Sequence, residues 1–216
     1  MNCRGMALVS GLILLTSVAL LAVTAAGSMT LQLHQAANIA EKQQAEDNAA
    51  MAASYAVAWL YSRGNTERQP GCVSNCLLPA GIHREEDLPD YPELGSMAWW
   101  QSMGTAAGSN PVSSEPLGYS ASGPLDSLWI MQEAHFQPSE QDSGEKTYDG
   151  VGYYRILSRG RGAHPGSVTV FEAIVARPWG ESVVREDFPP GAPLYEFCHQ
   201  FPVDLPCGIQ SWRVRR

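Results

Sequence analysis

The sequence predicts an α+β protein in which a long N-terminal helix packs on a small antiparallel sheet. Three features predict it: an apolar N-terminal run, a proline-free helical stretch that continues it, and three later runs rich in β-branched and aromatic residues. The chain has 216 residues, of which 44% are hydrophobic, enough for a folded domain with a core. Its net charge of −8 leaves no basic excess, so we expect no nucleic-acid binding.

The N-terminal run is apolar enough to cross a bilayer. No charged residue occurs between Met6 and Met29, and Arg4 is the only charged side chain before Glu41. As a helix, this run would be roughly 36 Å long, which spans the hydrocarbon core with some tilt. Arg4 favours an orientation with the N-terminus inside and the rest of the chain outside. We predict a transmembrane half-helix over residues 6–30.

A cleaved secretory signal is the alternative interpretation of this run. A small-residue site at Thr24-Ala25-Ala26 would place the cleavage before Gly27. Two features argue against it: the segment before the apolar run holds one positive charge, and helix-compatible sequence continues past the site.

The helix is predicted to continue as an amphipathic half over residues 31–63. No proline occurs from Met6 to Ser62, so we expect one helix of about 57 residues, ended by Gly64 in a left-handed conformation. Small and apolar residues recur on one face and predict a stripe that lets the sheet approach closely: Ala45, Ala49, Ala52, Ala53, Ala56, Val57 and Leu60.

Residues 64–216 are predicted to form an exported globular head. The segment 66–127 is rich in Pro, Gly and Ser and predicts loops with a short helix near 94–103. Strands are expected at 128–136, 151–157 and 167–176, with 159–166 as the hairpin loop between the last two.

Acidic residues are concentrated between positions 70 and 150, which hold twelve acids and two bases. A solvated surface is the ordinary explanation of such a run. Calcium binding is the alternative, because Asp142, Glu145 and Asp149 offer oxygen ligands in one loop, although their spacing is not that of the twelve-residue calcium loop.

Four cysteines follow the apolar run, and an even number in an exported head predicts disulfides. We favour the local pairs Cys72–Cys76 and Cys198–Cys207, because each brackets a turn. Pairing of Cys72 with one of the two later cysteines is an alternative, and a zinc site that uses the four cysteines, or His199, is another.

No catalytic motif occurs in the sequence. The nucleophile elbow, the phosphate-binding loop and the zinc-protease helix motif are all absent, and the five histidines are scattered. We therefore expect no enzymatic activity, no cofactor and no metal.

Two segments resemble a known family. The run Arg4-Gly5-Met6-Ala7-Leu8-Val9-Ser10-Gly11-Leu12 resembles a type IV prepilin leader with the helix that follows it, and most closely that of PilX-type minor pilins. The segment Tyr153 to Gly160, together with Val168 to Ala176, resembles the family's Y-R-I-x-x-x-G turn and terminal strand. The first match covers about a quarter of the chain and is the more specific.

The resemblance implies that a prepilin peptidase cleaves between Gly5 and Met6, that Met6 becomes N-methylated, and that residues 1–5 leave as a leader carrying Cys3. It also implies an inner-membrane protein with a single span and a periplasmic head, which then enters a pilus filament at the cell surface. The implied partners are other minor and major pilins, the inner-membrane assembly platform and a tip adhesin.

One position departs from the family pattern. Most pilins carry Glu at the fifth mature position, where this chain has Ser10. In the family that Glu neutralises the N-terminal amine of a neighbouring subunit, so its absence favours a place in a tip or priming complex. We expect a minor pilin for type IV pilus assembly. The alternatives are a minor pseudopilin of a type II secretion system and a membrane-anchored or secreted periplasmic binding domain.

Overall fold

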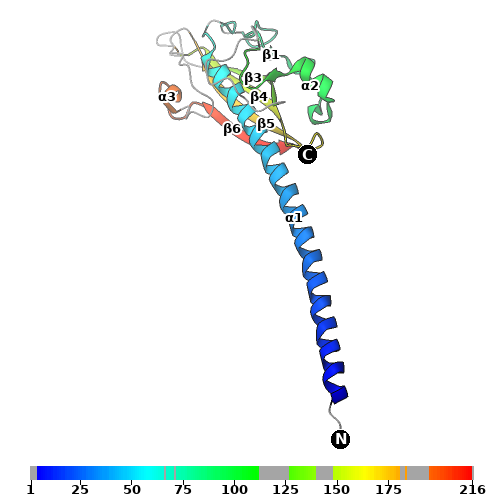
Figure 1. The fold of residues 1–216 in the computed structure, drawn as a ribbon. Coiled ribbons are helices and arrows are strands. Elements are labelled where there is room, and N and C mark those ends of the chain that lie inside the picture. The colour runs from blue at the N-terminus through cyan, green and yellow to red at the C-terminus, as the bar shows by residue number, and fades with distance from the viewer. Residues whose placement is uncertain are drawn as a thin grey trace. The chain divides into compact units, whose positions relative to one another are not determined.

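The computed structural model describes residues 4–65, 67–70, 72–111, 127–139, 148–180, 183 and 195–215. Helix α1 (Arg4–Ser62) belongs to two compact units, Met1–Glu41 and Lys42–Arg216. The first unit contains the apolar part of α1, and the second, which we call the head, contains the rest of α1 and the sheet (Figure 1). A long helix packed on a sheet confirms the predicted α+β class.

The head is built on a six-stranded sheet with the order β1-β3-β4-β5-β6, in which β2 also pairs with β3. Strands β3 (Leu128–Pro138), β4 (Gly150–Arg161), β5 (Val168–Trp179) and β6 (Gly208–Arg215) are antiparallel. The two-residue strand β1 (Ile82–His83) runs parallel to β3, so the sheet is mixed rather than purely antiparallel, and β2 (Thr105–Ala106) is antiparallel to β3.

Three of these strands were predicted, but each is longer than its apolar run. Strand β4 continues to Arg161 and β5 begins at Val168, so the expected hairpin loop 159–166 is wrong at its start. The observed loop is closed by a hydrogen bond from the Gly162 amide to the Ser167 carbonyl at 2.8 Å. Gly160 is thus a strand residue, and it lies against the backbone of α1 at Ala45 and Ala49.

Each face of the sheet carries its own core. One face packs against the last turns of α1 through Trp59, Trp129 and Ile156, among other buried side chains. The opposite face packs against helix α2 (Met97–Met103), whose Trp100 is fully buried. The N-terminus of α2 is capped by Ser96, which accepts a bond from the Trp99 amide at 3.2 Å.

The remaining described segments are short, as the Pro-rich and Gly-rich sequence predicted. They comprise the 3₁₀ turns η1 (Glu85–Asp87) and η2 (Pro92–Leu94) and the one-turn helix α3 (Tyr195–Cys198). The C-terminal end of α1 differs from the prediction. Gly64 does not adopt a left-handed conformation; its amide instead donates to the Glu67 carboxylate at 2.7 Å.

Candidate functional site

The first part of the candidate site is the apolar half of α1. Val9–Ser62 is the only helix among the described residues that is long and apolar enough to cross a membrane, and the segment that qualifies it is unburied. Large side chains such as Leu14, Leu21 and Val23 are each more than two-thirds exposed. A surface of this kind is stable in lipid or against other apolar helices, not in water.

Hydroxyl groups do not interrupt this apolar surface. Thr16 and Ser17 donate to the Ile13 carbonyl at 2.9 and 2.8 Å, and Thr24 donates to the Leu21 carbonyl at 3.0 Å. A hydroxyl that returns to its own helix needs no water partner. The helix therefore carries polar atoms into an apolar environment without leaving them unpaired.

The predicted processing and assembly positions lie at the start of α1. Gly5 and Met6 are helical in backbone, and Ser10 is exposed one turn later. Ser10 follows Met6 by four residues, about one helical turn. Cleavage between Gly5 and Met6 stays a prediction.

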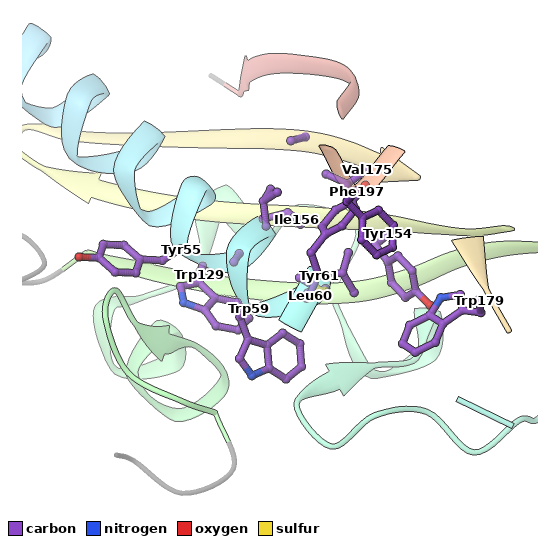
Figure 2. Close-up of a cluster of buried hydrophobic side chains, with 14 of the residues drawn as sticks. Tyr55, Trp59, Leu60, Tyr61, Trp129, Tyr154, Ile156, Val175, Trp179 and Phe197 are labelled. Carbon is purple, nitrogen blue, oxygen red and sulfur yellow. The ribbon is translucent and has the colours of Figure 1, made fainter. Parts of the chain in front are cut away.

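The second part of the site is the buried end of α1 in the head. Residues 55–62 of α1 are all buried, and Figure 2 shows Trp59, Leu60 and Tyr61 among side chains of the sheet. Trp59 packs on Trp129 with ring centroids 5.4 Å apart, and Tyr61 meets Phe197 edge-on at 4.7 Å. Aromatic contacts of this kind add to the free energy gained from burial alone.

Arg177 of β5 caps the helix from inside the core. Its Nη1 donates to the Leu60 carbonyl at 2.7 Å, and its Nη2 donates to the Arg63 carbonyl at 2.6 Å. The guanidinium also stacks 3.8 Å from the centre of the Trp179 ring. The last carbonyls of a helix have no partner within the helix and attract a cation. Burial lowers the pKa of Arg177 to about 10, so the group is still charged at neutral pH.

Tyr61 ties the same helix end to two strands. Its hydroxyl donates to the Ala176 carbonyl at 2.6 Å and accepts from the Gly208 amide at 2.8 Å. Burial raises the pKa of Tyr61, despite the opposing effects of the Gly208 hydrogen bond and of nearby Arg177. One phenol thus fixes α1 to β5 and to the start of β6.

The Ala stripe of α1 lies close to the backbone of strand β4, as the sequence predicted. Ala45 and Ala49 are fully buried, and a Cβ at Gly160 would clash with the backbone of both residues. The Asn48 side-chain Nδ2 donates to the Arg161 carbonyl at 2.6 Å, so a side chain of α1 is bonded to the backbone of β4 beside this contact. Of the predicted stripe, only Ala53 is partly exposed.

The four head cysteines form the two favoured local disulfides, Cys72–Cys76 and Cys198–Cys207. The second lies beside the helix anchor, since the Cys207 sulfur is 3.9 Å from the Tyr61 hydroxyl. These sulfurs are consumed as disulfides, so the alternative zinc site made of the four cysteines is wrong, as is the long-range pairing. Two disulfides fit an oxidising location for the head.

A buried ion pair holds the first disulfide loop on the sheet. Arg68 donates to both Glu133 carboxylate oxygens, at 2.8 and 3.0 Å, and to the Cys72 carbonyl at 3.1 Å. Tyr154 donates to the same carboxylate at 3.1 Å. The Arg68 guanidinium lies 3.4 Å from the Phe136 ring centre. Nothing in the sequence distinguished Arg68 or Arg177 from solvated arginines.

Two of the three proposed calcium ligands, Asp142 and Glu145, lie outside the described residues. Asp149 is described, and its amide donates to the Trp179 carbonyl at 2.6 Å. Within the described parts of the chain, no three His, Cys, Asp or Glu side chains gather in a metal-binding arrangement.

Comparison of the chain with protein-family models, curated proteins and solved structures found no match.

Proposed function

We propose that this protein is a minor pilin of the PilX type that takes part in type IV pilus assembly from the inner membrane. The observation that carries the proposal is one helix with two kinds of surface. Its first half is exposed and apolar, and its last two turns are buried all round in a disulfide-bonded head. Such a chain is suited to leave a bilayer only for an equally dry environment, which a bundle of similar helices supplies.

The anchoring of α1 also supports this proposal. A subunit whose helix is packed into a filament transmits force between that helix and its head. Arg177, Tyr61 and the contact beneath Ala49 fix the helix end to three neighbouring strands. A simple membrane tether needs no such fixation, because a flexible linker would serve it equally well.

Intact-mass analysis of the exported protein tests the proposal. Cleavage between Gly5 and Met6, with methylation of the new N-terminus, is expected. A product that begins at Gly27, or an unprocessed N-terminus, would support a periplasmic binding domain instead. The same measurement reports whether all four head thiols are oxidised.

A minor pseudopilin of a type II secretion system shares the expected processing. Capture of membrane partners distinguishes the two, because we expect co-purification of pilus subunits and of the pilus assembly platform. Recovery of secretion-system subunits alone would favour the pseudopilin. Most pilins carry Glu where this chain has Ser10. Within a pilus, this difference supports a place in the tip or priming complex, where the subunit would contact a tip adhesin.

A further inference from the structure

The two edges of the head sheet carry opposite charge. Strands β1 and β6 are the ends of the sheet order (Figure 1). We define the basic edge as the exposed β6 residues Ile209, Trp212, Arg213 and Val214, together with Arg215, whose side chain is 16% exposed. We define the acidic edge as the turn after β1 and the adjacent disulfide loop: Val73, Leu77, Glu85, Glu86 and Asp87.

Three arginines of the sheet converge on one carboxylate beside the basic edge. The Glu172 carboxylate accepts Arg213 at 2.8 Å and also pairs with Arg155 and Arg215, both at 3.2 Å. Three guanidiniums thus share one carboxylate in a chain whose net charge is −8. The Arg213 side chain is 64% exposed, so it can meet a second anion without leaving Glu172.

The same edge exposes an aromatic side chain. Trp212 is 71% exposed, and its ring meets Phe171 at 5.8 Å. Charged residues on an edge strand are an ordinary protection against aggregation. An exposed Trp beside them is not, because Trp and Arg are the residues most often found at the energetic centre of protein interfaces.

The acidic edge supplies a matching recess. The Cys72–Cys76 loop and the turn η1 enclose a hollow of about 460 Å³, lined by Glu85, Glu86 and Val73, among others. The Glu86 side chain is 75% exposed and pairs at 3.8 Å with Arg84, the one basic residue in the lining. Val73, which lines the recess, is 57% exposed, and Leu77, the neighbour of the lining residue Leu78, is 72% exposed.

We propose that the basic edge of one head docks on the acidic edge of a second copy of this chain. The Arg213 guanidinium meets the carboxylates of Glu85 and Glu86, and Trp212 packs on Val73 and Leu77. The two edges differ, so the contact is heterologous and repeats from copy to copy. This contact lies in the head and does not depend on the fate of the apolar half-helix.

Sedimentation of the full-length protein in detergent tests the contact, with two double variants. Trp212→Ser/Arg213→Gln removes the basic edge, and Glu85→Gln/Glu86→Gln removes the acidic edge. We expect wild-type association to rise with concentration and fall with salt, because exposed charges are screened. Each variant should raise the dissociation constant about tenfold or more.

An equimolar mixture of the two variants gives the decisive result. Each copy then keeps one intact edge, so dimers should form and growth should stop there. Lys42→Gln/Asp47→Asn, two exposed changes elsewhere in the head, is the charge control and should behave as wild type. Near-ultraviolet circular dichroism checks that each variant is folded. Association that neither variant weakens, a monomeric wild type, or a mixture without dimers would each overturn the proposal.

Discussion

Arg177 of β5 donates a hydrogen bond to the carbonyl of Leu60 in the last turn of α1, at 2.7 Å. A helix that ends inside a core leaves carbonyl groups that neither water nor the helix can satisfy. Here the guanidinium fork donates to two carbonyls: that of Leu60, which also accepts from the Arg63 amide at 3.3 Å, and that of Arg63 at 2.6 Å. The end of helix α1 is therefore bonded directly to strand β5 inside the head.

Replacement of Arg177 by Met should destabilise the head strongly. The Arg63 carbonyl would lose its guanidinium donor, and the Leu60 carbonyl would keep only the bond from the Arg63 amide at 3.3 Å, which together costs about 3 kcal/mol of unfolding free energy. For a domain of this size, the melting temperature should fall by roughly 6–12 °C. Arg177→Lys should rescue only part of the loss, because one ammonium group does not reproduce the fork.

Arg84→Met is the matched control for this change, because the Arg84 side chain is 48% exposed. It should leave the melting temperature of the head within about 2 °C. Equal melting temperatures for Arg177→Met and the wild type would contradict the capping role of Arg177.

Gly160→Ala should loosen the packing between α1 and the sheet. The added methyl group would clash with the backbone of Ala45 and Ala49, and a helix backbone does not yield as a side chain does. Overpacking of this kind costs about 1–3 kcal/mol. Denaturant titration followed by Trp fluorescence measures it. Gly166→Ala is the matched control, since its Cβ would meet nothing within 4 Å, and a comparable loss there would refute the explanation.

Alkaline pH should destabilise the head through two buried phenols. Burial raises the pKa of Tyr61, and burial together with the Glu133 carboxylate raises the pKa of Tyr154, from the ordinary value of 10.0. Above that pH the unfolded chain loses these protons more easily than the folded one. The stabilisation is thus complete below pH 10 and is lost as the pH rises through the folded-state values.

Urea unfolding at increasing pH, compared between the wild type and single Tyr→Phe variants, measures this effect. Tyr61→Phe and Tyr154→Phe should each reduce the loss of stability above pH 10. Tyr91→Phe should not, because Tyr91 is 64% exposed. A pH dependence that is identical in all four proteins would exclude these phenols as its source.

The sequence predicted the parts of the fold that are marked by a pattern of small or apolar residues extending over many positions. The Ala stripe and the three apolar strand runs each extend over several positions, and the structure confirms them. Strand β6 was missed because its apolar residues Ile209 and Trp212 are three positions apart and break the alternation of a strand. Gln210 is an extra residue in β6, so Ile209 and Trp212 pair with Val175 and Ala173, which lie on one face of β5.

The anchor residues were missed for a different reason. Arg177 and Arg68 are 0% and 1% exposed, yet arginine in a sequence ordinarily indicates a solvated side chain. Their partners are carbonyls and a carboxylate that lie far away in the chain. Gly64 was assigned the cap because only a local signal is visible in a sequence, whereas the observed cap comes from β5.

The two disulfides should differ in importance. Cys198–Cys207 joins α3 to the start of β6, and its Cys207 sulfur lies 3.9 Å from the Tyr61 hydroxyl that anchors α1. Cys198→Ser/Cys207→Ser should therefore cost about 2–3 kcal/mol and increase hydrogen exchange in β6. The loop closed by Cys72–Cys76 is also held by Arg68 and Glu133. Cys72→Ser/Cys76→Ser should cost less, and a larger loss there would contradict the stabilising role of the ion pair.

Ser10→Glu tests the proposed place of the subunit in the filament. A carboxylate at this exposed position, one turn after Met6, would neutralise the terminal amine of a neighbouring copy if the subunit packs within a shaft. We expect the variant to enter shafts more often than the wild type, which immunogold labelling should find mainly at tips. Ser10→Gln is the control, because it adds a similar volume without charge. If the wild type is labelled along shafts and the Glu variant is incorporated no differently, Ser10 does not direct the subunit to the tip.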